Sequence, residues 1–318
     1  MKLKVTIQEE EKAFYGHGKL LITGEYFVLD GARALAVPTK FGQRMRVKEL
    51  QATSGLLYWV ALNNKKQAWL NLVFDTKDFT CLNAKQDEAQ RLTKILTETR
   101  KLNPEFLTAC KDMAVETLLE FPNEWGLGTS STLIHCVSKW AGVDGYQLLK
   151  NTLGGSGYDV ACAENDSAIL YQLQSGLPST TPIEWEPVFK NSIYFAYTGV
   201  KKISSEAIKY YREQLRDKTQ VIESLNQITD SILKSTTVVE FEKLITEHET
   251  LVGSQLKIQP IKDTMFAGYW GSVKSLGAWG GDFVLMTNEK SEEELKNYLA
   301  EKNMNTVFSW GNLILSHK

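Results

Sequence analysis

The sequence contains few cysteines, no long apolar run and no excess of charge of either sign. Only four of its 318 residues are cysteines, and none of these (Cys81, Cys110, Cys136 and Cys162) forms a CxxC pair. Neither a disulfide framework nor a zinc site is therefore expected. No segment approaches the roughly 18 apolar residues of a membrane-spanning helix, and no signal peptide is expected at the N-terminus. These absences predict a cytoplasmic protein without a membrane partner.

Charge and composition narrow the class further. Lys and Arg together number 36, and Asp and Glu number 38, so the net charge is −2 with neutral histidines. A general nucleic-acid-binding protein carries a basic surplus, so no nucleic-acid partner is expected. A local basic pocket for a small anion is not excluded by this total. With 43% hydrophobic residues, 22 Gly and 7 Pro, the composition is that of a globular protein, and the length suits two packed domains.

The spacing of apolar residues predicts a mixture of strands and helices. Strand-like runs cover residues 2–8, 20–23, 26–29, 44–47, 56–62, 68–74, 192–197, 283–286 and 307–310. Helical spacing covers residues 87–101, 104–119, 131–140, 146–153, 208–232, 239–251 and 292–299. Because these elements do not alternate as regular βαβ units, the pattern favours an α+β fold. Residues 173–187 hold three prolines and little periodicity, which predicts a boundary between an N-terminal domain, 1–187, and a C-terminal domain, 188–318.

The loop PNEWGLGTSS, residues 122–131, is the most informative segment. Gly126 and Gly128 precede Thr129, Ser130 and Ser131 at the expected start of a helix. Such a turn can direct several backbone N–H groups and the positive end of the helix dipole at a phosphate group, and its hydroxyls can reach Mg²⁺. The loop lacks the lysine of a Walker A motif. A glycine turn with a Ser/Thr cap explains the same residues, so the loop alone leaves both interpretations open.

Three further segments carry residue types that suit chemistry on a small substrate. Asp159 follows the loop 154–157, so its carboxylate can orient or deprotonate a substrate hydroxyl, or only cap a helix. Lys19 opens an apolar run and can offset the charge of a transferred phosphoryl group, although a lysine at a strand start is often merely solvated. The glycines of segment 277–282 allow close approach of the backbone to a ligand, or form a tight turn.

Together and in this order, the segments resemble the motifs of the GHMP kinase superfamily of small-molecule kinases. GKLLITGEYFVL (18–29) resembles the first motif, PNEWGLGTSST (122–132) resembles the phosphate loop PxxxGLGSSAA, and SLGAWGGD (275–282) resembles the third motif. The resemblance spans nearly the whole chain. Within the superfamily it leans toward the mevalonate-pathway branch, and there toward the phosphomevalonate kinases, whose GSGFDVAAA is similar to GSGYDVACA (155–163). Mevalonate kinases carry a glutamate where this chain has Leu148.

The resemblance implies an ATP- and Mg²⁺-dependent kinase of isoprenoid precursor synthesis that acts on a small-molecule acceptor. It implies two α+β domains, the first like ribosomal protein S5 domain 2 and the second ferredoxin-like. It also implies that Asp159 is the catalytic group that orients the acceptor, with Lys19 beside it to stabilise the developing charge. The implied ATP-binding residues are Gly126, Leu127, Gly128, Thr129, Ser130 (also the Mg²⁺ ligand) and Ser131. The implied substrate-binding residues are Glu25, Ser156, Gly157, Lys201, Ser204, Gly277, Gly280 and Gly281.

Departures from the family motifs leave the acceptor open. His17 stands where a proline is usual, Trp279 replaces a glycine, and Thr129 and Thr132 replace Ser and Ala. The first expectation is transfer of the ATP γ-phosphoryl group to 5-phosphomevalonate. The alternatives are a mevalonate kinase or another small-molecule kinase and, in a different class, an inactive member that binds a ligand as a sensor. Whether the chain forms a homodimer is left open.

Overall fold

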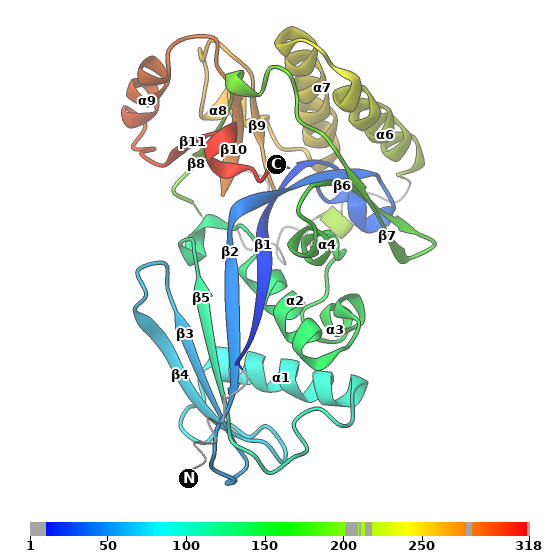
Figure 1. The fold of residues 1–318 in the computed structure, drawn as a ribbon. Helices are drawn as coiled ribbons and strands as arrows, with labels where there is room; N and C mark the ends of the chain where they lie inside the picture. The colour runs from blue at the N-terminus through cyan, green and yellow to red at the C-terminus, as the bar shows by residue number, and fades with distance from the viewer. Residues whose placement is uncertain (1–10, 201–208, 210, 214–217, 278–281, 317–318) are drawn as a thin grey trace, which may run out of the picture. The chain divides into compact units, whose positions relative to one another are not determined.

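The computed structural model describes residues 11–200, 209, 211–213, 218–277 and 282–316 (Figure 1). The chain folds into two compact units, each built from three segments. Unit 1 comprises Met1–Gly16, Gly42–Pro122 and Thr129–Gly155, and unit 2 comprises His17–Phe41, Asn123–Gly128 and Ser156–Lys318. The predicted boundary after residue 187 falls inside unit 2 and stays a prediction, as does the strand expected at 2–8, which lies outside the described residues.

Two long strands contribute residues to both units. They are β1 (Glu11–Thr23) and β2 (Ala34–Glu49), which pair with each other. In unit 1, residues 43–49 of β2 pair antiparallel with β5 (Met113–Leu119), and β5 pairs parallel with β3 (Leu56–Leu62). A hairpin joins β3 to β4 (Ala68–Asp75), as the sequence predicts. Its turn is held by the Asn63 side chain, which accepts hydrogen bonds from the backbone N–H groups of Lys65 and Gln67.

Three helices of unit 1 pack together beside these strands (Figure 1). They are α1 (Asp87–Leu102), α2 (Thr129–Ala141) and α3 (Gly145–Thr152), and all three were expected. The helix predicted over 104–119 is wrong, because residues 104–112 form turns and irregular structure and residues 113–119 form β5. The segment MAVETLL buries every second residue, Val115, Thr117 and Leu119, which is the period of a strand in a sheet.

Unit 2 contains a hairpin and a separate four-stranded sheet. The hairpin joins β6 (Ala168–Gln174) to β7 (Leu177–Ile183), and β6 also pairs with residues 34–36 of β2. The sheet has the order β11-β8-β10-β9, and its strands are β8 (Ile193–Tyr197), β9 (Val273–Ser275), β10 (Phe283–Thr287) and β11 (Val307–Ser309). The sequence predicts no strand over 173–183. Pro178 and Pro182 lie in β7, a strand at the end of the described order, where proline is tolerated.

The helices of unit 2 complete its core. The longer ones are α4 (Tyr158–Glu164), α6 (Thr219–Lys234), α7 (Val238–Leu256) and α9 (Glu292–Ala300). The short ones are η1 (Phe27–Asp30), η2 (Asn123–Trp125), η3 (Lys190–Ser192), α8 (Ile261–Thr264) and α10 (Trp310–Leu313). Helices α6 and α7 contact each other, and α7 contacts β9 (Figure 1). The strand expected over 26–29 is instead η1, because the chain turns at Gly24 (φ 90°) and Tyr26 (φ 61°).

Mixed strand directions and helices without a βαβ rhythm confirm the predicted α+β class. In the part of the chain that the structure describes, no helix is both long and apolar enough to cross a membrane.

Candidate active site

The structure brings together Lys19 and Asp159, the two residues expected to be catalytic. Lys19 lies on β1, and Asp159 is the second residue of α4. The Lys19 Nζ atom is 3.3 Å from the Asp159 Oδ1 atom and donates a hydrogen bond to the Gly126 carbonyl at 3.2 Å. Lys19 and Asp159 lie 140 positions apart along the chain, and both belong to unit 2, as does Gly126. The fold rather than the local sequence therefore brings Lys19 and Asp159 together.

The surroundings of Lys19 keep it charged. The residue is only 9% exposed. Burial disfavours the ammonium form, but Tyr158, Asp159 and Asp282 outweigh that effect and raise the pKa of Lys19 above its usual range. Burial and the neighbouring Asp159 likewise raise the pKa of the Tyr158 phenol. At neutral pH the site therefore presents a fixed cation and an un-ionised phenol beside Asp159.

The glycine loop 126–128 lies directly beside Lys19. The backbone N–H of Lys19 donates to the Leu127 carbonyl at 2.9 Å. Gly126 (φ 66°) and Gly128 (φ 98°) both adopt backbone angles that side chains rarely allow. A Cβ atom at position 126 would come 2.3 Å from the Asp282 carboxylate, so only glycine fits there without displacing Asp282.

Asp282 is itself held in an unusual conformation. Its φ is 52°, its N–H donates to the Val200 carbonyl at 2.7 Å, and its carbonyl accepts from the Thr198 N–H at 2.8 Å. These two bonds fix the backbone at the end of the third motif. Sequence reasoning did not place Asp282 among the site residues, although its motif was singled out.

The helix that follows the glycine loop begins with hydroxyl residues. Thr129, Ser130 and Ser131 form the first turn of α2 in unit 1, where the helix dipole supplies partial positive charge. Ser130 is exposed, whereas Ser131 and Thr132 are buried. The hydroxyl of Thr132 lies 2.7 Å from the Gln43 Oε1 atom, so this departure from the family motif serves packing inside unit 1.

The loop before α4 ends in a glycine with a left-handed backbone. Gly157 has φ 93° and occupies the N-cap position of α4, immediately before Tyr158 and Asp159. Ser156 is 8% exposed, and its carbonyl accepts a hydrogen bond from the Tyr171 hydroxyl. Both residues were expected near the substrate. Here their backbone sets the direction of the first turn of α4.

Two other expectations receive a structural explanation. His17 bridges neighbouring segments of unit 2, because its Nε2 atom lies 2.9 Å from the Asp166 Oδ1 atom and its Nδ1 atom lies 3.2 Å from the Thr39 carbonyl. Leu148 is fully buried in α3, so its apolar side chain belongs to the core of unit 1.

Glu25, which the resemblance places near the substrate, is buried inside unit 2. The residue is 1% exposed, and its carboxylate forms an ion pair with Lys274 and lies 3.4 Å from the His248 Nε2 atom. In this position the carboxylate contacts protein groups rather than open space. The sequence did not indicate a role for Lys274 or His248. A lone lysine in the short run Val273–Ser275 carries no sequence signal that separates a buried side chain from a solvated one, and neither does a single histidine in a helix.

The remaining expected residues belong to the third motif and to the segment that follows β8. Gly277 has φ 74°, and no atom lies within 4 Å of the position that a Cβ would take. Lys201, Ser204, Gly280 and Gly281 lie outside the described residues, as does Trp279. Their expected roles stay predictions.

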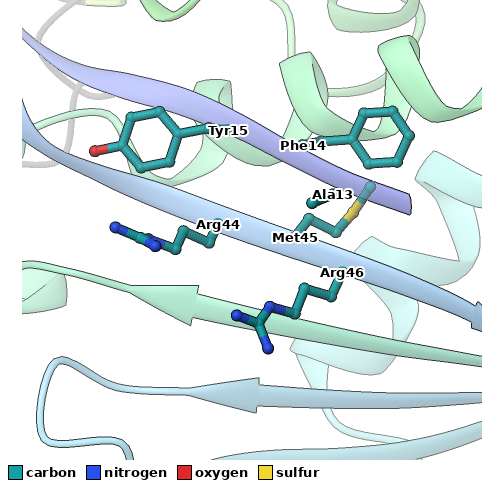
Figure 2. Close-up of a pocket in the computed structure, with 6 residues that line it drawn as sticks. All are labelled: Ala13, Phe14, Tyr15, Arg44, Met45 and Arg46. Atoms are coloured by element: carbon teal, nitrogen blue, oxygen red, sulfur yellow. The ribbon is translucent and has the colours of Figure 1, made fainter. Parts of the chain in front are cut away.

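A cavity in unit 1 lies against β1 and β2 (Figure 2). It has a volume of about 380 Å³ and is lined by Ala13, Phe14, Tyr15, Arg44, Met45 and Arg46. Arg44 is one of the two cationic side chains that line it. Its Nε atom already donates to Glu120 at 2.7 Å, and the Tyr15 hydroxyl donates to the other oxygen of the same carboxylate. The Arg44 guanidinium is therefore already paired with a carboxylate of unit 1.

Comparison with solved structures defines the class of fold. A mevalonate kinase superposes with a TM-score of 0.68 at 20% identity, over 93% of this chain and 98% of that chain. Streptococcus pneumoniae phosphomevalonate kinase in complex with phosphomevalonate and AMPPNP gives 0.69 at 15% identity, over 93% and 99%. Lactococcus lactis galactokinase complexed with galactose gives 0.67 at 12% identity, over 92% and 89%.

The protein therefore has the two-domain fold of the GHMP kinases, as its motifs led us to expect, and mevalonate-pathway enzymes are among the structures it resembles. No protein-family model and no curated protein matches the sequence. At these identities the likeness identifies the fold and leaves the acceptor open, since the three enzymes are named for different acceptors.

Proposed function

We propose that this protein is a small-molecule kinase that transfers the γ-phosphoryl group of ATP to a small acceptor. The observation that carries the proposal is the 3.3 Å pair of Lys19 and Asp159 beside the glycine loop 126–128, within a fold of the GHMP kinase type. A merely buried lysine or a helix-capping aspartate would not account for the contact between Lys19 and Asp159. Neither would account for the close approach of Asp282 to Gly126, where any side chain would collide with the Asp282 carboxylate.

The residues suit phosphoryl transfer by positioning and charge stabilisation. The acceptor oxygen attacks the γ-phosphorus, the bond to the β,γ-bridging oxygen breaks, and ADP leaves with that electron pair. Asp159 orients the acceptor and takes the proton when the acceptor is a hydroxyl. Lys19, a cation at neutral pH, offsets the negative charge that grows on the transferring group.

Mg²⁺ fits the proposed site as a nucleotide-bound ion. In the described residues no group of three or more His, Cys, Asp or Glu side chains gathers as a metal site. Mg²⁺ in nucleotide sites is usually bound by phosphate oxygens and water with one or two protein ligands. The exposed Ser130 hydroxyl at the start of α2 would be such a ligand. When bound, the ion neutralises charge on the nucleotide phosphates.

We further propose 5-phosphomevalonate as the acceptor. The supporting features are the likeness of GSGYDVACA to the phosphomevalonate kinase motif and the apolar, buried Leu148. An acceptor that is itself a phosphate is already ionised at neutral pH, so Asp159 would then act by orientation rather than by proton removal.

The test is ADP release by the purified protein with Mg²⁺ and ATP, in separate reactions with 5-phosphomevalonate, mevalonate and galactose. Turnover of 5-phosphomevalonate alone supports both proposals. Turnover of another acceptor supports a kinase and overturns the choice of acceptor. Binding of ATP in calorimetry without turnover of any acceptor contradicts the kinase and favours a ligand sensor.

A further inference from the structure

A cluster of buried charged residues lies in unit 2 outside the pair described above. It consists of Glu25, His248, Glu249 and Lys274, here called the Glu25 cluster, and each member is no more than 2% exposed. Lys and Glu are almost never buried to this extent unless they are paired. The cluster draws on three segments, namely the turn after β1, helix α7 and strand β9.

The contacts of the cluster tie these segments together. Lys274 forms an ion pair with Glu25, and its Nζ atom also donates to the Ser275 carbonyl at 2.9 Å. The His248 Nε2 atom accepts a hydrogen bond from the Gly24 N–H at 3.1 Å. The Glu249 carboxylate accepts from the Ser275 N–H, at 3.3 Å to each oxygen. The turn at the end of β1 and the end of β9 are therefore both anchored in one polar network.

Each anchored segment leads to a part of the proposed active site. Strand β1 carries Lys19 and ends at Thr23, two residues before Glu25. Strand β9 ends at Ser275 and is followed by Leu276, whose N–H donates to the Phe283 carbonyl at 3.0 Å, and by Gly277. The same motif ends at Asp282, beside Gly126. The ion pair thus joins the strand of Lys19 to the strand from which the third motif begins.

Stability alone does not account for a charged pair at this place. Removing two charges from water is costly, and replacing a buried ion pair by apolar side chains of similar volume is often neutral or stabilising. Helix α7 already packs against β9. The ion pair instead contributes geometric specificity, because the attraction between its two charges favours one placement of β9 relative to the turn after β1.

We propose that Lys274 is a positioning residue, whose ion pair with Glu25 sets the start of the third motif relative to the strand that carries Lys19. This inference rests on the kinase proposed above. Lys274 acts through Glu25 and the backbone of Ser275, and it touches neither reactant.

The test is carried out at pH 8, above the pKa of about 7 of Glu25, so that the wild-type pair is ionised. It uses Lys274→Met, Glu25→Gln and the double variant, in which both charges are absent and the volumes are nearly kept. The singles leave one charge buried without its partner, so they are expected to lose stability, and the double variant is expected to regain it. A misplacement of about 1 Å lowers the rate roughly 100-fold, so kcat of the folded double variant is expected to fall by roughly 10- to 100-fold. KM for ATP should change less, because the glycine loop 126–128 is not part of the cluster.

Two controls separate position from stability. Lys296→Met removes an exposed ion pair with Glu292 in the same unit and is expected to leave kcat unchanged. Leu299→Ala destabilises the core of unit 2 without touching the cluster, and kcat per folded molecule is expected to stay at the wild-type value. A double variant with wild-type stability and wild-type kcat overturns the proposal.

Hydrogen exchange provides a readout that does not need turnover. The amides of Leu276 and Asp282 are bonded to the Phe283 and Val200 carbonyls, and both are expected to exchange faster in the double variant than in the wild type. If the wild type turns over no acceptor, the kinase proposal fails, while this readout still decides the positioning role. Unchanged exchange at both amides contradicts it.

Discussion

The ammonium of Lys19 lies 3.3 Å from the carboxylate of Asp159, and its own N–H and Nζ both bond to carbonyls of the loop that begins at Gly126. One lysine thus touches the acid expected to orient the acceptor and the loop expected to hold the ATP phosphates. Substitution of Lys19 is therefore expected to affect catalysis more than folding.

Lys19→Met is expected to lower kcat by roughly 10²- to 10³-fold, the usual cost of losing one group that stabilises transition-state charge. Asp159 is 25% exposed at its side chain and can keep water after the change, so the variant should fold. Steady-state kinetics and thermal unfolding measure the two effects. A variant with wild-type kcat would mean that Lys19 is structural only.

Gly126 can be tested against Gly142 as a control, because the two glycines have nearly the same backbone angle but different surroundings. Their φ angles are 66° and 65°, but a Cβ at 126 meets the Asp282 carboxylate at 2.3 Å, whereas at 142 no atom lies within 4 Å. Both Gly→Ala variants are expected to lose about 1–2 kcal/mol through the left-handed backbone. Only Gly126→Ala should lose activity, because it displaces Asp282. Equal activities in the two variants would contradict a role for this contact.

The pH dependence of stability tests the state of Glu25. Burial raises the pKa of Glu25 to about 7, although Lys274 acts in the opposite direction. The folded protein therefore binds a proton that the unfolded chain releases between pH 4.5 and 7, and the contribution of Glu25 to stability falls as the pH rises through that range.

Glu25→Gln removes this titration and serves as the reference. The free energy of unfolding of the wild type minus that of the variant is expected to fall by about 3 kcal/mol between pH 4.5 and 7, at about 1.36 kcal/mol per pKa unit. Burial lowers the pKa of His248, so the contribution of His248 to stability changes with pH in the opposite direction to that of Glu25. Burial also raises the pKa of Glu249. Both residues are present in the wild type and in Glu25→Gln, so the difference between the two proteins reports on Glu25. Urea unfolding at several pH values measures the difference. A difference that rises with pH would show that the ion pair dominates over burial.

Thr132→Ala tests whether a departure from the family motif is structural. Removal of the hydroxyl leaves the buried Gln43 Oε1 atom without the bond at 2.7 Å, which is expected to cost about 1–3 kcal/mol. The Thr132 side chain belongs to the buried face of α2, so kcat should stay within about twofold. In free energy this is well below the roughly 1.36 kcal/mol of one pKa unit. A large loss of kcat with unchanged stability would instead place Thr132 at the nucleotide.

The sequence predicts the strongly periodic elements and the motif residues well, because their signals are local. The hairpin of β3 and β4, helices α1 to α3 and strand β10 form where expected. Residues 113–119 were misjudged because Leu118 and Leu119 extend an apolar helical spacing, whereas burial in the sheet follows every second residue. The β6–β7 hairpin was missed because prolines at its outer strand resemble a linker.

The functional groups that sequence reasoning missed depend on distant contacts. Lys274 has no periodic signal, and its role follows only from Glu25, which lies 249 positions earlier. Asp282 became informative once the structure placed its carboxylate against Gly126. Conversely, Glu25 belongs to a motif associated with substrate, yet burial turns its carboxylate toward Lys274. Motifs indicate which segments matter, and tertiary packing decides what each side chain does.

The central claim is that the Lys19–Asp159 pair supports transfer of a phosphoryl group from ATP. The most direct measurement is product formation, followed by mass spectrometry, for the wild type and Asp159→Asn with Mg²⁺, ATP and each candidate acceptor. The account predicts a phosphorylated acceptor with the wild type and a rate at least roughly 100-fold lower with the variant, which keeps the shape of the side chain but loses its charge. Equal rates in the two proteins, or no phosphorylated product from the wild type with any acceptor, would contradict it.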